Sequence, residues 1–254
     1  MTPAAVNRLD SILLNRNWIW SRHPFPHVSA TDVFTADAYR AFEQAFFTMS
    51  ARMSSYLPQH DTHGTTITPG ARGPLTFFAS RAWHDLLAGL LGIRSTGHVN
   101  LGLHHHRPGS ANGFPHNDLN PGWFVDYRSE SGIVLAQPDV CSYTTGEAHV
   151  TDTAPRRVIR ACALIFYIAN PRWRCGDGGE TGLYKRATDE PAQPYCSIPP
   201  INNSLLAFEC TPYSFHGFIR NARSQRNSLI MWLHREESEV TRRWGGDAIV
   251  NYRV

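Results

Sequence analysis

Residues 204–234 read SLLAFECTPYSFHGFIRNARSQRNSLIMWLH. Short apolar or alternating runs in this stretch are separated by Pro, Gly, Asn and Ser, and they lie at 204–209, 214–218 and 228–234. Similar runs precede them at 98–105, 133–136, 158–168 and 181–184. Runs of this length bounded by turn residues are typical of β-strands. The series therefore predicts a mostly β fold with flanking helices, built as a sandwich or jelly roll.

Helical spacing characterises the first third of the chain. A capping residue around Thr31 precedes 36–56, where aromatic and Met side chains recur at intervals close to one helical turn. This periodicity predicts an amphipathic helix whose apolar stripe packs on a sheet, because such side chains are usually buried. A second helix is predicted at 80–91 and ends at Gly92, since glycine commonly terminates helices.

The chain is expected to fold as a single domain, 1–254. Its 254 residues and 42% hydrophobic content suffice for a sizeable core. Residues 58–74 are rich in Gly, Thr and Pro, which predicts a long loop between the two helices. We therefore expect a helical N-terminal part at 1–94 that supports a β core at 95–254.

Charge and composition exclude several classes of partner. The net charge of +3 is spread along the chain and forms no Lys/Arg block, so we expect no nucleic-acid partner. Residues 1–20 lack the continuous apolar segment of a signal peptide, and no later run is long enough to span a bilayer. We therefore expect no membrane association and a cytoplasmic location. The five cysteines form no CxxC pair, which argues against a zinc site or a disulfide framework.

Pro115-His116-Asn117-Asp118 is the strongest local candidate for a chemical site. If His116 and Asp118 lie on a strand, their side chains point to the same face, where one metal ion can bind both. A surface or turn pair is the alternative, because thirteen histidines make such a pair easy to find by chance. The pair therefore needs further ligands to carry a functional argument.

His216, in the apolar run 214–218, is the candidate third ligand, because a jelly roll can bring distant strands together. Two His and one carboxylate leave three octahedral positions open, which favours iron(II) over structural zinc. Ten residues later, Arg226 begins an apolar strand. A buried guanidinium there needs an anion, such as the distal carboxylate of 2-oxoglutarate. An internal Asp or Glu is the alternative partner of Arg226.

Several segments, in order along the chain, resemble the prolyl-4-hydroxylase-like branch of the 2-oxoglutarate/iron(II) dioxygenases. They are PFPH at 24–27, LLGI at 90–93, HRPGS at 106–110, NPRW at 170–173, GGET at 178–181, NSLLAF at 203–208 and R-x-S at 226–228. The resemblance implies a double-stranded β-helix core and a hydroxylase that uses iron(II), 2-oxoglutarate and O2. It also implies that His116, Asp118 and His216 bind the iron, and that Arg226 and Ser228 bind the cosubstrate.

Two positions depart from the pattern of this family. The family tyrosine before the P-G turn is His106 here, and the tyrosine of the Y-L-N strand is displaced to Tyr167, which leaves Ile168 at the matching position. Both family tyrosines contact the cosubstrate, so His106 and Tyr167 are the remaining expected cosubstrate-binding residues. His106 can donate a hydrogen bond, whereas Ile168 cannot.

The expected substrate is a small molecule, amino-acid-like or a secondary metabolite, because the compact chain has no added recognition module. Asp118 favours hydroxylation of an unactivated C–H bond, or desaturation or ring formation, over halogenation, since related halogenases have Gly or Ala in place of this carboxylate. The pocket is expected to lie between 58–74, 120–129 and 137–157. Aromatic side chains and arginines in these segments suit an acidic molecule: Trp123, Phe124, Tyr127, Tyr143, Arg128, Arg156 and Arg157.

Three other functions remain open at this point. The first is a hydroxylase of prolyl or other residues in a protein. The second is a cupin-like binding protein without turnover, although such a protein has no need of an arginine ten residues past its last ligand. The third is a zinc hydrolase with the same ligands, but no general base can be named for it. A homodimer is one option for the assembly.

Overall fold

The computed structural model describes residues 9–57, 62–150 and 154–251. Its α-helices are α1 (Leu9–Ile12), α2 (Ala36–Ser50), α3 (Arg81–Leu91) and α4 (Glu237–Trp244), and its 3-10 helices are η3 (Pro74–Ala79) and η4 (Gly246–Ala248). Strands β1 to β7 are Ile19–Ser21, His27–Ala30, Ser54–Leu57, Thr62–Thr66, His98–His106, Pro121–Phe124 and Val134–Leu135. Strands β8 to β13 are Arg156–Tyr167, Thr181–Leu183, Cys196–Ile198, Ser204–Glu209, His216–Phe218 and Arg226–Arg235.

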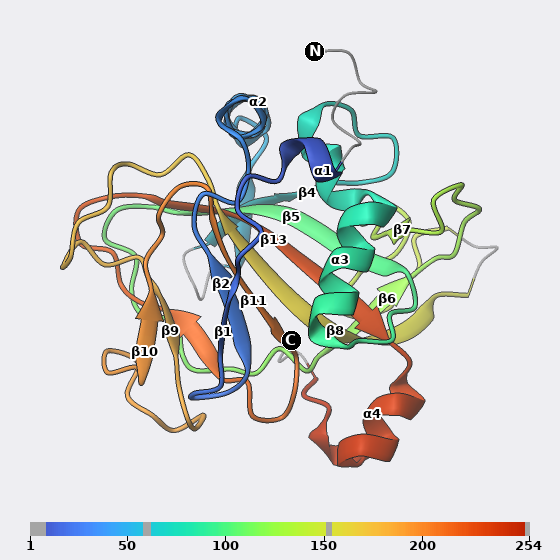
Figure 1. Cartoon of the computed structure of the whole chain (residues 1–254). Coiled ribbons are helices and arrows are strands. Elements are labelled where there is room, and N and C mark those ends of the chain that lie inside the picture. Colours follow the sequence, from blue (N-terminus) through green and yellow to red (C-terminus); the bar gives the residue numbers. More distant parts are fainter. Residues whose placement is uncertain (1–8, 58–61, 151–153, 252–254) are drawn as a thin grey trace.

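Two sheets form the core (Figure 1). The larger has ten strands, with the order β1-β2-β11-β8-β13-β5-β4-β3, and β6 and β7 pair with β8 and β5. The smaller consists of β10, β9 and β12 in that order. All pairs except β5 with β7 are antiparallel. The fold is a double-stranded β-helix with flanking helices, as the sequence predicts.

Alternation along the central strands separates two cores. On β13, Leu229, Met231 and Leu233 face the helices and pack with residues of α2, η3 and α3. Ile230 and Trp232 face the smaller sheet and form the second core. The run 229–233 is therefore continuously apolar because both faces of the strand are covered.

Helix α3 matches the predicted helix at 80–91. Ser80 caps its first turn by accepting a hydrogen bond from the backbone nitrogen of Trp83, and Gly92 ends it in the left-handed conformation (φ 65°). The N-cap of α2 is Thr35 and not a residue near Thr31, since its hydroxyl accepts from the backbone nitrogen of Ala38. Among the described residues, no helix is long and apolar enough to cross a membrane.

Two of the predicted boundaries are wrong, and both errors concern one hairpin. Helix α2 ends at Ser50, and residues 54–56, predicted as the end of that helix, form part of strand β3 (Ser54–Leu57). Strand β4 occupies part of 58–74, which was predicted as a loop, while 58–61 lie outside the described residues. Pairing of β4 with the long strand β5 overrides the local preference for helix and loop, because it satisfies backbone groups along a buried strand. The strand content is therefore not confined to 95–254.

Candidate active site

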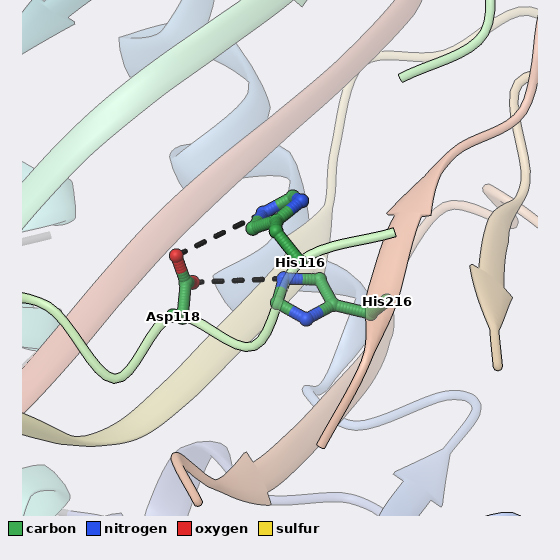
Figure 2. Close-up of side chains that lie close together, drawn as sticks. All are labelled: His116, Asp118 and His216. Carbon is green, nitrogen blue, oxygen red and sulfur yellow. Dashed lines mark ion pairs between the residues drawn. The ribbon is translucent and has the colours of Figure 1, made fainter. Parts of the chain in front are cut away.

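Three side chains that could hold a metal ion converge inside the β core (Figure 2). Donor atoms of His116, Asp118 and His216 all lie within 4.8 Å of one another. Nε2 of His216 is 3.5 Å from Oδ2 of Asp118, and Nε2 of His116 is 3.8 Å from Oδ1. Asp118 and His216 are buried, whereas the His116 side chain is 39% exposed. The cluster is therefore open toward solvent on its His116 side.

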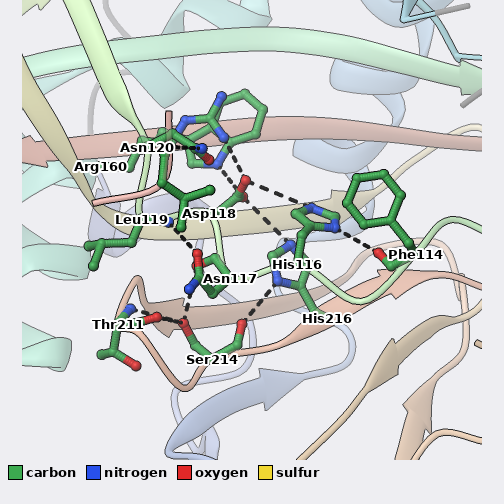
Figure 3. Close-up of polar contacts among 12 residues, drawn as sticks. Phe114, His116, Asn117, Asp118, Leu119, Asn120, Arg160, Thr211, Ser214 and His216 are labelled. Atoms are coloured by element: carbon green, nitrogen blue, oxygen red, sulfur yellow. Dashed lines mark hydrogen bonds and ion pairs between the residues drawn. The ribbon is translucent and has the colours of Figure 1, made fainter. Parts of the chain in front are cut away.

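The backbone brings these residues together in a way that differs from the prediction. His116 forms an isolated β-bridge to His216, and Asp118 has a left-handed conformation with φ 57°. His116 and Asp118 therefore do not share a strand, which was the condition under which alternation would align their side chains. Asn117 stabilises the turn between them, since its Oδ1 accepts a hydrogen bond of 3.1 Å from the backbone nitrogen of Leu119 (Figure 3). The turn at Asn117 and Asp118, and not the alternation of side chains along a strand, directs the Asp118 carboxylate toward the two imidazoles.

Hydrogen bonds to backbone carbonyls fix the tautomer of both histidines. Nδ1 of His116 is 3.0 Å from the carbonyl oxygen of Phe114, and Nδ1 of His216 is 3.2 Å from that of Ser214 (Figure 3). A carbonyl can only accept, so each Nδ1 carries the hydrogen and each Nε2 presents a lone pair. Two lone pairs and a carboxylate then face one another, an arrangement that a cation stabilises. These residues fit a divalent metal ion with nitrogen and oxygen ligands.

Two further side chains hold the Asp118 carboxylate. Nη1 of Arg160 donates to Oδ1 at 2.6 Å, and Nε1 of Trp232 donates to Oδ2 at 2.7 Å. The guanidinium of Arg160 also lies over the Trp232 ring, 3.8 Å from its centroid. Burial alone would raise the pKa of Asp118, but Arg160 and the two histidines hold that pKa well below its usual value. The carboxylate is therefore ionised and fixed in orientation.

Arg160 is in turn held by a buried polar cluster. Its Nε donates to the Tyr143 hydroxyl at 3.0 Å, and that hydroxyl is 2.8 Å from Nε2 of His234. Nδ1 of His234 donates to the carbonyl of His98 at 2.9 Å, so Nε2 accepts from the Tyr143 hydroxyl. Gly122 allows this approach, because a Cβ there would lie 2.5 Å from the Tyr143 ring and 2.8 Å from Nε2 of His234.

Arg226 is buried without a carboxylate partner among the described residues. Its Nη1 donates to the hydroxyl of Ser228 and its Nη2 to that of Thr181, both at 3.1 Å, while its buried Nε has no hydrogen-bond acceptor. The alternative of an internal Asp or Glu is therefore not met in the described part of the chain. Burial lowers the pKa of Arg226 from its ordinary value. Such a site favours an anionic ligand, and the carboxylate of a keto acid fits it.

His106 lies beside Arg226 on the neighbouring strand. The two residues are directly paired between β5 and β13. The imidazole of His106 stacks on the ring of Phe218, with centroids 4.0 Å apart and an interplanar angle of 8°. Phe218 also lies 5.7 Å from the Arg226 guanidinium. His106 therefore forms part of the wall around Arg226.

Tyr167 also reaches the Arg226 site, despite its displacement in the sequence. Its hydroxyl donates to Oγ1 of Thr181 at 2.7 Å, and its ring centroid is 5.2 Å from the Arg226 guanidinium. Ile168 faces the opposite core, with the helices. The strand ends after Tyr167, and Ala169 has a left-handed conformation with φ 56°. Tyr167 therefore points inward and forms part of the wall around Arg226.

The residues expected to line a small-molecule pocket mostly have structural contacts. Phe124 and Tyr143 are buried, at 1% and 7% exposure, and the Tyr127 hydroxyl accepts from the backbone of β7. Arg156 and Arg157 form ion pairs with glutamates at the start of α4. Part of the expected frame, 58–61 and 151–153, lies outside the described residues. Arg156 and Arg157 are therefore neutralised within the fold and are not available to bind an acidic small molecule.

Three contacts at the site were missed from the sequence. Arg160 and Trp232 hold Asp118, and Thr181 links Arg226 to Tyr167. Arg160, in the run 158–168, carries a guanidinium in an apolar strand just as Arg226 does. That signal was present in the sequence, whereas the roles of Trp232 and Thr181 required the strand register.

A profile of the 2OG-Fe(II) oxygenase superfamily matches residues 139–234, a segment that contains His216 and Arg226. The match covers less than half of the chain, and together with the cluster of His116, Asp118 and His216 it supports a dioxygenase that uses iron(II), 2-oxoglutarate and O2. No curated protein matches the oxygenase sequence.

Solved structures support the fold of this oxygenase. A prolyl-4-hydroxylase from Pseudomonas putida has a TM-score of 0.53 and 16% identity, with coverage of 92% of this chain and 98% of its own. A prolyl hydroxylase from Trichoplax adhaerens, in complex with a peptide fragment of the hypoxia inducible factor oxygen degradation domain, has a TM-score of 0.55 and 15% identity. That match covers 85% of this chain and 86% of the other.

The expectation of a small-molecule substrate is wrong. Both structures are prolyl hydroxylases, and the second contains a peptide, so they point to a peptide or protein substrate. The compactness of the chain was a poor guide, because a fold of this size can accommodate a peptide without an added module.

Proposed function

We propose that this oxygenase hydroxylates a residue within a peptide or protein, with a prolyl-type side chain as the first candidate. Iron is held by His116, Asp118 and His216, and 2-oxoglutarate by Arg226 together with Ser228, His106 and Tyr167. The observation that carries the proposal is the buried Arg226 guanidinium without an acidic partner among the described residues. The prolyl hydroxylases of similar fold support a peptide as the substrate.

Iron and 2-oxoglutarate, when bound, supply the oxidising chemistry that places one oxygen atom of O2 in a C–H bond while the keto acid becomes succinate and CO2. The protein positions the reactants and excludes water. Arg226 orients the keto acid through its distal carboxylate. Arg160 and Trp232 keep Asp118 ionised and in one orientation, and Phe208 packs against the His216 ring with centroids 4.7 Å apart.

A mixture of synthetic peptides, each with one proline in a different context, tests the proposal. With iron(II), 2-oxoglutarate and O2, we expect peptide-dependent succinate and a product peptide heavier by one oxygen atom. Asp118→Gly should abolish both signals and serves as the control. If no peptide raises succinate formation above the rate without peptide, the peptide substrate is refuted, although the iron and cosubstrate assignment is not.

A further inference from the structure

The net positive charge of the chain is concentrated by the fold. Three loops follow β5, β8 and β12, at 107–115, 168–180 and 219–225. They contain five arginines and two acidic residues, a net charge of +3 that equals that of the whole chain. This charge is dispersed along the sequence, as predicted, but the fold gathers it in space.

Backbone hydrogen bonds join these three loops to one another. In the loop 219–225, the carbonyl of Asn221 accepts from Gly109 at 2.8 Å, and the carbonyl of Ile219 accepts from Gly179 at 3.1 Å. Gly178 permits the closest approach, because a Cβ there would lie 1.9 Å from the carbonyl oxygen of Arg220. In Figure 1 the loops, coloured green, gold and orange-red, lie together at the left edge.

All the exposed charged side chains of these loops are positive. They are Arg107, Arg172, Arg174, Arg220 and Arg223, and none of them has an ion pair within the described residues. The two acidic residues are partly buried. Asp177 accepts from the backbone of Arg174 at 2.7 Å, and Oε2 of Glu180 is buried. The five arginines therefore give this surface a net positive charge. Arg156 and Arg157 differ from them, because each is paired with a glutamate.

The first of these loops, 107–115, borders the exposed side of the metal cluster. Phe114 is near the end of the first loop, is 57% exposed, and lies 5.6 Å from the His116 ring between centroids. His116 is the ligand candidate that faces solvent. A peptide that reaches the cluster past Phe114 therefore passes beside the basic loops.

We propose that these three loops, the basic loops, form a docking surface for a carboxylate-rich peptide segment next to the hydroxylated residue. The inference rests on the proposed function and adds the class of its substrate. Exposed arginines attract an acidic chain over a range set by the salt concentration, about 10 Å at 0.1 M. Phe114 supplies an apolar contact at the point where the segment meets the metal cluster.

Three labelled peptides of equal length test the inference, each with a central proline flanked by Glu, Gln or Lys. Binding is measured by fluorescence anisotropy on the protein loaded with Mn(II) and 2-oxoglutarate, which fill the site without turnover. We expect the Glu peptide to bind at least about tenfold more tightly than the Gln peptide, the sum of several weak surface contacts, and the Lys peptide least. The difference should shrink steeply between about 50 and 300 mM salt.

A pair of charge-matched variants locates the effect. The first variant replaces four arginines of the basic loops by Gln: Arg172, Arg174, Arg220 and Arg223. The control variant replaces four other arginines by Gln: Arg22, Arg52, Arg94 and Arg242. The control arginines are also exposed and have no ion pair among the described residues. Both variants lose four positive charges, so they differ only in position. We expect the first to lose the preference for the Glu peptide, about tenfold in affinity, and the control to retain it.

Equal loss in both variants, or no preference for the Glu peptide in the unmodified protein, overturns the inference. Tighter binding of a nucleic-acid oligomer than of the Glu peptide at equal charge also overturns it. Failure of the protein to bind 2-oxoglutarate at all, measured separately by calorimetry, refutes the proposed function instead. The two failures are therefore distinguishable.

Discussion

Replacement of Arg226 by Met should separate function from stability, because this buried guanidinium has neutral partners only. Its two hydrogen bonds go to the hydroxyls of Ser228 and Thr181, and no described carboxylate compensates its charge. An uncompensated buried charge opposes folding. We therefore expect Arg226→Met to leave the free energy of unfolding of the metal-free protein unchanged, or to raise it by up to about 2 kcal/mol.

The same substitution should remove most of the affinity for 2-oxoglutarate. Two charge-assisted hydrogen bonds to a carboxylate contribute about 1.5 to 3 kcal/mol each, so the loss is at least about 3 kcal/mol, or roughly a hundredfold in Kd. Urea denaturation gives the stability, and calorimetric titration of 2-oxoglutarate into the Mn(II)-loaded protein gives the affinity.

Arg235, at the other end of β13, provides the matched control. It is also fully buried, but it pairs with Glu209 and Glu239 and donates to the carbonyl of Ala161. Arg235→Met should lower the free energy of unfolding by about 2 kcal/mol and leave the affinity for 2-oxoglutarate intact. If Arg226→Met destabilises the protein as Arg235→Met does and spares 2-oxoglutarate, Arg226 is a structural residue and the assignment of the cosubstrate site is refuted.

Three further predictions concern the surroundings of Asp118. Tyr143→Phe should weaken iron(II) binding several-fold, because it removes a hydrogen bond that holds Arg160. The control Tyr184→Phe removes a hydroxyl that donates to the carbonyl of Pro191 and should leave iron(II) binding unchanged. Equal iron(II) affinities of the two variants in anaerobic titrations would contradict this prediction. Gly122→Ala should destabilise the protein by about 2 kcal/mol through overlap with Tyr143, measured by urea denaturation; an unchanged midpoint would count against the tight packing. Burial keeps the pKa of His234 well below its usual value, so it stays neutral in the folded protein while the unfolded chain takes up a proton below about pH 6.5. Stability should therefore fall as the pH drops, and His234→Gln should reduce that slope by about 1.4 kcal/mol per pH unit near pH 5, with an unchanged slope as the contrary result.

The β core was predictable because its strands carry their signals locally. Runs such as 161–168 and 229–233 are apolar throughout, and the turn residues between them set the strand ends. The hairpin of β3 and β4 was not predictable in this way. Residues 54–57 continue a helical pattern, and only pairing with β5, distant in sequence, turns this region into strands.

The candidate site shows the same division between local and long-range information. His116, Asp118, His216 and Arg226 were predicted from residue type and spacing; the first three converge in one cluster, and Arg226 is buried and donates to Thr181. The left-handed turn at Asp118 could not be read from the sequence, because it depends on contacts made by the folded chain.

The charge pattern was the least accessible feature. Arginines in three separate loops are unremarkable along the chain, and their convergence follows from the order of the strands that the loops connect. The nature of the substrate was misjudged for a related reason, since the surface of a docking site is assembled from distant segments.

Anaerobic titration of the protein with iron(II) and then 2-oxoglutarate tests the central claim most directly. A keto acid that chelates iron held by His116, Asp118 and His216 should produce a weak visible charge-transfer band that saturates at one equivalent of each. The band should be absent in Asp118→Gly and should require far more 2-oxoglutarate in Arg226→Met. Folded, unmodified protein that binds iron(II) without developing the band, or a band that survives in Asp118→Gly, would contradict the assignment.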